Sequence, residues 1–389
     1  MFDTSAINLR ILKERAYNLR WATVPDGVIP LTAADPDFKS APEIAEAISN
    51  FASDRYLCYG PPTGLPEFRE SVAKFFRNKR SIPATADLVL PVDSAAFGIY
   101  LIVKSFMQAG DEALIFDPVD FLFRYSVETI GATAVPFAIP PGTDHLDFDA
   151  FEKKITPKTK LLCLCNPLNP TGKVFTREEL LRFGELAEKH DFMILSDEIW
   201  SDIIFKPFEF TSIASLNETI RNRTITVTGY SKSYGLAGMR IGAVLASTTE
   251  QFDRLFAVSL HGSTIHGANV LSQIAAATAL NKCEGWLNGF VNHLQKMRDL
   301  VVNELNSMKG VSCIAPEGCY VALANITGTG KSSSEIQELL MNEAKVAVVP
   351  GLKQWFGEGA EGYIRLSFAT SEDILKEALD RMKHTLNSI

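Results

Sequence analysis

The sequence lacks both a stretch long enough to cross a membrane and a start typical of a secreted protein. Its longest uncharged apolar run, residues 95–103, is far shorter than the roughly 20 residues that span a bilayer. The first residues, MFDTSAINLR, are acidic and polar where a secretory signal needs a basic head and an apolar run. The six cysteines lack the paired spacing of a metal site, which favours free thiols in a reducing compartment. We therefore expect a cytoplasmic protein with no membrane partner.

Basic residues are neither in excess nor clustered. Lys plus Arg number 38 against 46 Asp plus Glu, so the formal net charge is −8, and no stretch gathers the positive charges. Nucleic acid is therefore not expected as a partner. With 46% hydrophobic and 22% charged residues, the composition excludes a disordered or collagen-like chain. The 389 residues suggest two or three domains, or one large domain with a smaller companion.

The middle of the chain alternates short β-rich runs with helical spacers or compact turns. Between two of these runs, Thr176 and Glu179 predict a capping box, and the helix they open ends near His190. Short crossovers of this kind imply parallel neighbours, and continuously apolar runs indicate strands buried on both faces. The pattern predicts an α/β fold with a doubly wound, mostly parallel sheet. The runs are LVLPV, ALIFD, AVPFAI, KLLCLC, FMILS, TITVT and IGAVLA.

The pattern changes after about residue 281. We expect a long helix over residues 286–308, then short strands mixed with helices, and a final amphipathic helix that begins at Ser371. The first forty or so residues contain several prolines but little periodicity, which indicates an extended arm. The predicted division is an N-terminal arm packed on the small domain, a large domain and a small α+β domain, at residues 1–45, 46–283 and 284–389.

Two polar residues follow buried strands. Asn169 lies in NPLNPTG, whose two prolines stiffen the loop at the carboxyl end of a strand, where doubly wound sheets bind ligands. The motif could equally be an ordinary turn, although that would not explain the rigid presentation of Asn169. Asp197 ends the strand FMILS, either as a turn or helix cap or as a buried charge that holds a cationic partner.

Two further segments could bind a cofactor. Lys232 follows the strand TITVT among small residues, where a lysine could form an imine, and Arg240 comes eight residues later, either to hold a phosphate or as a surface charge. The glycines of this segment do not complete a dinucleotide fingerprint. Ser94 is expected to cap a helix, and the small residues that follow could also receive an anion at that helix start.

Taken together, these motifs resemble the class I/II aminotransferase family of fold type I pyridoxal-phosphate enzymes. NPLNPTG, SDEIW and SKSYGLAGMRIG match its signatures, and their joint order is far more specific than any one of them. The resemblance covers nearly the whole chain. Further segments that fit are ADPDF (34–38), YGPPTGLPEFR (59–69), AGDEALIFDP (109–118) and GYIRLSFA (362–369).

The resemblance implies pyridoxal 5'-phosphate as cofactor and a role for each matching residue. Lys232 would hold the cofactor as a Schiff base and then carry protons, and Asp197 would keep the ring nitrogen protonated. Asn169 would bond the ring oxygen, with Trp200 near it. The phosphate would be bound by Ser94, Ala95, Ala96, Ser231 and Arg240.

The resemblance also implies a substrate site and a partner. Arg365 would bind the α-carboxylate of the substrate, with Asn169 and Ala34 beside it. Tyr59 resembles the tyrosine that reaches the phosphate in a partner subunit, which implies a homodimer with shared active sites. The substrates would be an amino acid and a 2-oxo acid, and no metal is expected.

Three positions depart from the family pattern. Asp120 takes the place of the aromatic ring that usually stacks on the cofactor, so that Phe121 or Phe123 would have to supply the stack. Trp200 takes the place of a tyrosine, and its indole N–H would donate from a different position. Gly229 replaces a hydroxyl residue that commonly helps to bind the phosphate. These departures bear on which reaction the enzyme catalyses.

The expected activity is therefore transfer of an amino group from an L-amino acid to a 2-oxo acid. The first alternative is a β-eliminating C–S lyase of the cystathionine β-lyase type, because ADPDF resembles the start of that subgroup. A non-catalytic binding protein of the same fold is the second alternative. We read NITGTGKSS, residues 325–333, as a surface loop rather than a phosphate-binding P-loop, because its first glycine is replaced by Asn325. His261 and His266 are too poorly spaced to suggest a metal site. They could line the mouth of the active site, but solvated loop residues are the expectation.

Overall fold

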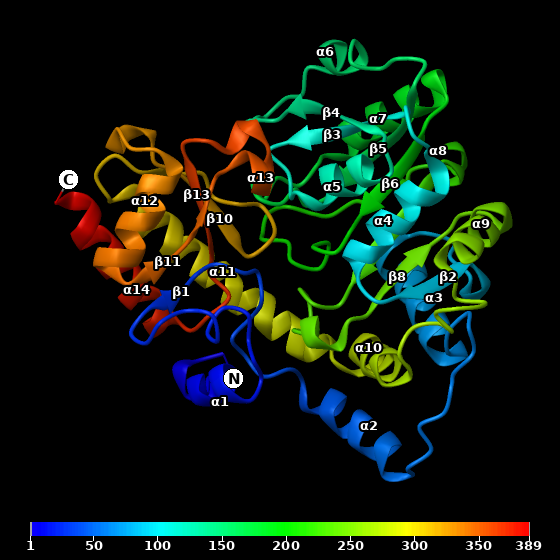
Figure 1. The fold of residues 1–389 in the computed structure, drawn as a ribbon, viewed down its shortest axis with the longest axis horizontal. Helices are drawn as coiled ribbons and strands as arrows, with labels where there is room; N and C mark the ends of the chain where they lie inside the picture. Colours follow the sequence, from blue (N-terminus) through cyan, green and yellow to red (C-terminus); the bar gives the residue numbers. More distant parts are fainter. Residues whose placement is uncertain (1, 389) are drawn as a thin grey trace.

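Two larger β-sheets and one two-stranded sheet organise the molecule, a computed structural model that describes residues 2–388. Residues 1 and 389, the outer ends of the predicted arm and small domain, lie outside this range. Figure 1 shows the seven-stranded sheet on the right and the four-stranded sheet on the left, with the long helix α11 (Glu284–Asn306) running beneath the smaller sheet.

All seven predicted β-rich runs form strands of the large sheet. Their order is β2-β8-β7-β6-β5-β3-β4, in which β8 is antiparallel to both neighbours and every other adjacent pair is parallel. This confirms the doubly wound, mostly parallel sheet. The strands are β2 (Val89–Val92), β3 (Glu112–Asp117), β4 (Thr133–Ala138), β5 (Thr159–Cys165), β6 (Met193–Asp197), β7 (Thr224–Gly229) and β8 (Gly242–Leu245).

The run AVPFAI differs from its prediction. It becomes β4, whose two end residues are exposed and whose two central residues are only half-buried. The expectation of burial on both faces is wrong for this run, because β4 is the edge strand and pairs on one side alone, with β3.

Helices pack against the large sheet. The crossover helix α7 (Arg177–His190) begins with the predicted Thr176–Glu179 capping box and buries Phe183, whose burial stabilises the fold by about 1.5–3 kcal/mol. Helix α4 (Ala95–Phe106) contacts strands β5 to β8. The other helices of this part are α2 (Pro42–Ser53), α3 (Pro66–Arg80), α5 (Leu122–Thr129), α6 (Phe148–Glu152), α8 (Glu218–Asn222), α9 (Thr249–Ser259) and α10 (Val270–Lys282).

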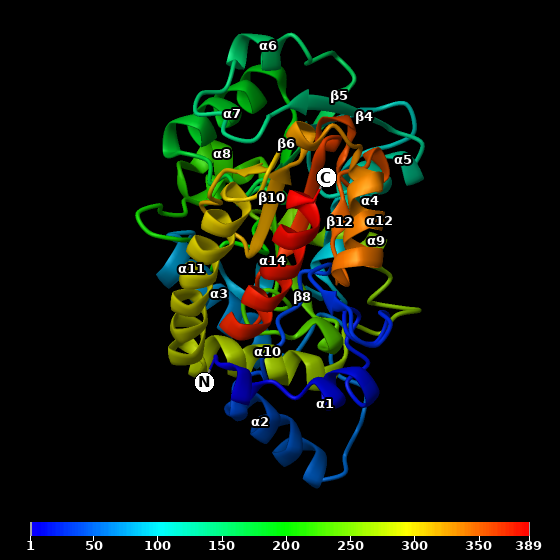
Figure 2. The same cartoon turned by 90° about the vertical axis from the view of Figure 1, so that its left-hand side faces the viewer.

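The four-stranded sheet is antiparallel, with the order β12-β13-β10-β9. Figure 2 shows α11 and α14 lying close to it, and the two helices contact one another. Ser371 caps α14 as predicted, whereas β12 and α13 were not expected from the sequence. The elements are β9 (Ser312–Cys313), β10 (Val321–Asn325), α12 (Ser333–Leu339), a π-helical turn (Leu340–Ala344), β11 (Val346–Ala347), β12 (Val349–Pro350), α13 (Lys353–Phe356), β13 (Tyr363–Ser367) and α14 (Glu372–Asn387).

The N-terminal segment lies against the smaller sheet. Its strand β1 (Ile29–Pro30) pairs in parallel with β11, and in Figure 1 the blue chain runs beside this part before it reaches α2. The segment is not wholly extended, because Asn8 caps the short helix α1 (Leu9–Glu14), which the sequence pattern did not predict. The domain boundaries after residues 45 and 283 stay predictions.

Candidate active site

A cavity of about 330 Å³ lies at the carboxyl ends of the parallel strands. Loops after β3, β5 and β7, the end of β6 and the start of α4 meet there because these parallel strands end at one edge of the sheet. Strand β13 of the smaller sheet closes the other side with Arg365. The predicted site residues that line the cavity are Ala34, Ser94, Ala95, Ala96, Asn169, Asp197, Trp200, Ser231, Lys232, Arg240 and Arg365.

Tyr59 is the one predicted site residue outside this cavity. Its side chain is 90% exposed, and its ring lies 5.4 Å from the ring of His266. Both residues line a separate hollow, which is formed by residues near the C-terminal end of α2 and near the start of α10. Tyr59 therefore does not contact the cavity of its own subunit.

Lys232 is partly buried inside the cavity. Its Nζ donates a hydrogen bond of 2.6 Å to the carbonyl oxygen of Ala34 and lies 5.3 Å from the centre of the Trp200 ring. Burial lowers the pKa of Lys232, while the negative charge of Asp35 opposes this shift. A lysine whose pKa is lowered in this way is a better nucleophile and proton carrier than a solvated one.

Asp197 is buried at the end of β6. Its Oδ1 accepts a hydrogen bond of 3.1 Å from the backbone N–H of Ile199, so the carboxylate both caps a turn and lines the cavity. Burial raises the pKa of Asp197 to about 7, and repulsion from Asp120 and Glu198 adds to this. A cation bound in the cavity would lower the pKa again.

The start of α4 can receive an anion. Ser94 caps the helix by accepting a hydrogen bond of 3.1 Å from Phe97 N–H, as predicted. The amides of Ala95 and Ala96 precede the first helical hydrogen bond, so they and the helix dipole face the cavity with partial positive charge. Ser231 and Arg240 line the same cavity. These donors suit a phosphate.

Close packing around position 229 explains why a glycine is found there. A Cβ atom there would lie 3.2 Å from Ile199 Cδ1 and 3.3 Å from the Ala95 Cβ, which is tighter than ordinary packing. The hydroxyl side chain that the family often places here would therefore need Ile199 or α4 to move.

The substrate side of the cavity contains a chain of three polar residues. Asn169 Oδ1 accepts a hydrogen bond of 3.3 Å from Arg365 Nη1, and Asn169 Nδ2 donates one of 2.9 Å to Asp120 Oδ2. Arg365 also donates to Thr32 O, at 3.0 Å, and its buried Nε has no partner among residues 2–388. A guanidinium with unused donors beside a cavity is suited to a carboxylate.

Aromatic residues cover another part of the wall. Trp200 is buried and packs edge-to-face on Tyr320, with ring centres 4.7 Å apart. Of the two candidates for stacking on the cofactor, Phe123 lines the cavity, whereas Phe121 packs outside it against Trp355.

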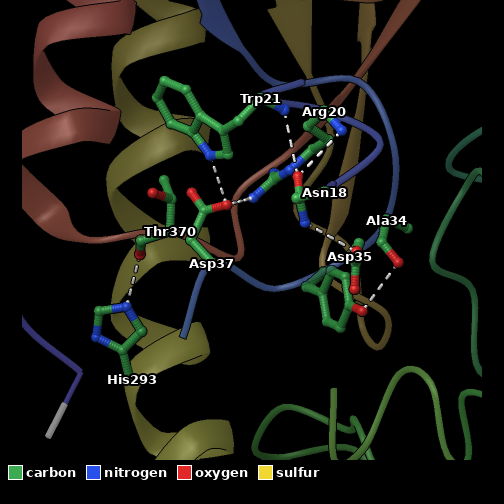
Figure 3. A network of polar contacts seen from close by, with 9 residues as sticks. Asn18, Arg20, Trp21, Ala34, Asp35, Asp37, His293 and Thr370 are labelled. Atoms are coloured by element: carbon green, nitrogen blue, oxygen red, sulfur yellow. Dashed lines mark hydrogen bonds and ion pairs between the residues drawn. The ribbon is translucent and has the colours of Figure 1, made fainter. Parts of the chain in front are cut away.

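A network of buried polar residues, shown in Figure 3, holds the segment that carries Ala34. Asn18 donates a hydrogen bond of 2.9 Å to Asp35. Asp37 forms an ion pair with Arg20 and accepts a hydrogen bond of 2.8 Å from Trp21 Nε1. Sequence reasoning assigned no role to these residues. The two aspartates of ADPDF are the only sequence signal for them, because their partners lie 16 or 17 positions earlier.

The remaining sequence candidates lie apart from the cavity. The loop over residues 325–333 lies at the surface, as expected, with exposed and half-buried residues between the buried Ile326 and Ser333. Its amides from Thr327 onward are largely bonded to neighbouring oxygens, which leaves them unsuited to a phosphate. The expectation that His261 is solvated is wrong. Its ring is buried between packed elements, and burial lowers its pKa.

The residues of the cavity fit pyridoxal phosphate. The start of α4 with Arg240 matches its phosphate, the buried Asp197 matches a protonated ring nitrogen, and Lys232 and Arg365 line the same cavity. The doubly wound sheet with a cavity at its strand ends places the protein among the fold type I pyridoxal-phosphate enzymes. The family model for aminotransferase class I and II matches residues 26–382. The chain therefore belongs to the class I and II aminotransferase family, and the enzyme is a pyridoxal-phosphate-dependent aminotransferase.

Several known proteins are similar to this chain. An aspartate aminotransferase from Pyrococcus abyssi is 34% identical over 365 residues, which cover 92% of each chain. The structure of an aromatic aminotransferase from Pyrococcus horikoshii is 30% identical and superimposes with a TM-score of 0.87 over 94% of this chain and 97% of that one. A PLP-bound protein from Clostridium difficile 630 is 27% identical, with a TM-score of 0.89 over the full length of both chains. Within residues 2–388, no helix is both long and apolar enough for a membrane span.

Proposed function

We propose that the enzyme moves the amino group of an L-amino acid to a 2-oxo acid with Lys232 as the covalent attachment point of its cofactor. Bound pyridoxal phosphate supplies an aldehyde that reacts with amines and a protonated ring that accepts electrons. One observation carries the proposal. The amine of Lys232, the carboxylate of Asp197, the start of α4 and the guanidinium of Arg365 line a single cavity.

Lys232 would act as both base and acid. When substrate amine displaces it, its free Nζ would take the proton from the substrate Cα and later return it to the other reacting carbon. The lowered pKa supports this role, because it shifts Lys232 toward the neutral amine, which is the form that can accept a proton. The carbonyl of Ala34, 2.6 Å from Nζ, would hold the amine in place.

Asp197 would stay ionised against the protonated ring nitrogen. Its buried position means that this pair is screened little by water, so the attraction between the two charges is strong. Ser94, Ala95, Ala96, Ser231 and Arg240 would bind the phosphate. Asn169, oriented by its bonds to Asp120 and Arg365, would donate to the ring oxygen, with the Trp200 indole nearby.

Arg365 would bind the α-carboxylate of the substrate with two parallel hydrogen bonds. Its position is supported by Thr32 O and Asn169 on one side and by the Phe356 ring, 5.1 Å from the guanidinium, on the other. Holding the carboxylate also orients the Cα–H bond toward Lys232, which lowers the entropic barrier to proton transfer.

We further propose a cytoplasmic homodimer in which Tyr59 reaches the phosphate site of the partner subunit. The exposure of Tyr59, and its distance from the cavity of its own chain, support this arrangement. Co-expression of Lys232→Ala and Tyr59→Ala chains tests it. If sites are shared, half of the sites in a mixed dimer carry both changes and the other half carry neither, so activity returns. No recovery on mixing would contradict shared sites.

The reaction is tested with a panel of amino donors and with 2-oxoglutarate or pyruvate as acceptor. Transfer should follow ping-pong kinetics, and Lys232→Ala should lower turnover by at least about 10²–10⁴-fold while the circular dichroism spectrum stays unchanged. Borohydride should fix the cofactor to Lys232 in the unaltered enzyme alone. Pyruvate and ammonia from cystathionine without an oxo-acid acceptor would indicate the C–S lyase instead, and a colourless protein that fixes no cofactor would indicate a non-catalytic one.

A further inference from the structure

Asp120 is the one charged residue of the cavity to which the proposed function assigns no contact with cofactor or substrate. It follows β3, and its backbone N–H donates to Asn169 O at 3.1 Å. Its Oδ1 accepts a hydrogen bond from Leu122 N–H at 3.2 Å, and its Oδ2 accepts one from Asn169 Nδ2 at 2.9 Å. Both oxygens thus accept N–H donors, and the positive charge of Arg365 also favours the ionised carboxylate, whereas burial raises the pKa of Asp120. The side chain is fixed and lines the cavity.

Few charged residues of the cavity remain to bind the substrate. Its charged residues are Asp120, Asp197, Lys232, Arg240 and Arg365. The proposed function assigns Arg240 to the phosphate and Lys232 to the attachment of the cofactor, so Arg365 is the one cation of the cavity that remains for the substrate. One amide side chain, that of Asn169, separates Arg365 from Asp120. A substrate whose α-carboxylate occupies Arg365 therefore meets a fixed negative charge beside it.

We propose that Asp120 makes the enzyme selective for amino acids with one carboxylate and excludes dicarboxylic ones such as aspartate and glutamate. This inference rests on the proposed function, and it concerns the specificity of the same site. A second carboxylate bound in this cavity, of about 330 Å³, would be repelled by Asp120, and we take about 6 Å as the working distance between the two charges. At the effective dielectric constant of partly buried sites, repulsion over that distance corresponds to about a 100-fold loss of affinity.

The surface that we assign to the partner's active site does not supply a compensating cation. The hollow that contains Tyr59 is lined by apolar and neutral residues together with His266, and by no lysine or arginine among residues 2–388. This hollow would thus offer no lysine or arginine to pair with a second carboxylate. The relative from Pyrococcus abyssi is named an aspartate aminotransferase, so its name implies a dicarboxylic substrate. The proposed selectivity of this chain is the opposite.

The test compares acids with amides of the same shape. Rates are measured for aspartate against asparagine and for glutamate against glutamine, in the unaltered enzyme and in Asp120→Asn, which removes the charge but keeps the shape. The binding of succinate and of its monoamide, succinamate, to the cofactor-loaded enzyme is measured by calorimetry as a readout independent of turnover. Asp117→Asn serves as the control, because Asp117 lies three positions earlier, bonds Gly359 N–H and does not line the cavity.

The unaltered enzyme should favour asparagine over aspartate, and succinamate over succinate, by about 10-fold or more. Asp120→Asn should reduce both ratios by about 10- to 100-fold, chiefly through KM, while Asp117→Asn leaves them unchanged. Equal use of aspartate and asparagine by the unaltered enzyme would overturn the inference, as would ratios that Asp120→Asn does not alter. If no amino donor is accepted at all, the proposed function fails, and the binding ratios still decide the inference.

Discussion

The buried ion pair between Arg20 and Asp37 is expected to be critical for the N-terminal segment. Both side chains are almost fully buried, with 0% and 1% of their surfaces exposed, and Trp21 also donates to Asp37. Asp37→Ala would leave the guanidinium of Arg20 buried without its countercharge. Removal of one partner from a buried pair typically lowers the free energy of unfolding by about 3–5 kcal/mol, because the remaining charge keeps its desolvation penalty.

The matched control is an exposed ion pair. Lys353 and Glu358 are 2.6 Å apart, but 66% and 72% of their side-chain surfaces are exposed to water. Glu358→Ala should therefore change the free energy of unfolding by no more than about 1 kcal/mol. A third variant, Arg20→Met with Asp37→Leu, removes both charges and should recover a large part of the loss caused by Asp37→Ala.

Urea unfolding followed by circular dichroism measures these differences, and hydrogen exchange locates them. Asp37→Ala should speed exchange in residues 18–37 first and should weaken cofactor binding, because the same segment places the carbonyl of Ala34 against Lys232. If Asp37→Ala costs no more than Glu358→Ala, or if the double variant is less stable than Asp37→Ala, the argument from an uncompensated buried charge is wrong.

Two further predictions concern the cavity. Gly229→Ser restores the hydroxyl residue common in the family but should weaken cofactor binding, because its Cβ would lie 3.2 Å from Ile199 Cδ1. The added change Ile199→Ala should restore cofactor binding. If Gly229→Ser alone bound the cofactor more tightly than the unaltered protein, the steric account would be contradicted. In cofactor-free protein, burial raises the pKa of Asp197 to about 7, from a usual value of 3.8. The folded protein therefore holds the proton of Asp197 more tightly than the unfolded chain does. The stability that the protonated side chain contributes is lost as the pH rises from about 4 to 7. Asp197→Asn should be up to about 4 kcal/mol more stable than the unaltered protein above pH 7 and equal to it near pH 4, as measured by urea unfolding at each pH; a difference independent of pH would refute this.

Local patterns predicted the elements of the large sheet well. Seven apolar runs became its seven strands, and Thr176 with Glu179 formed the predicted capping box, because strand burial and helix capping depend on residues close together in the sequence. The short helix α1 was missed because six residues show too little periodicity. Burial of β4 was overestimated because an apolar run does not reveal which strand forms the edge.

For the candidate site too, some features followed from local sequence patterns and others from the tertiary structure alone. The sequence motifs, through their resemblance to a known family, determined the class of cofactor and predicted residues that line one cavity, since each motif combines strand, turn and helix signals within a few residues. The tertiary structure alone decided that Asp120 lies one amide from Arg365, that Phe123 rather than Phe121 lines the cavity, and that Asp35 and Asp37 are held by residues of the arm. These contacts join segments up to about two hundred residues apart, and their distances depend on how two sheets pack, which no local pattern of residues encodes.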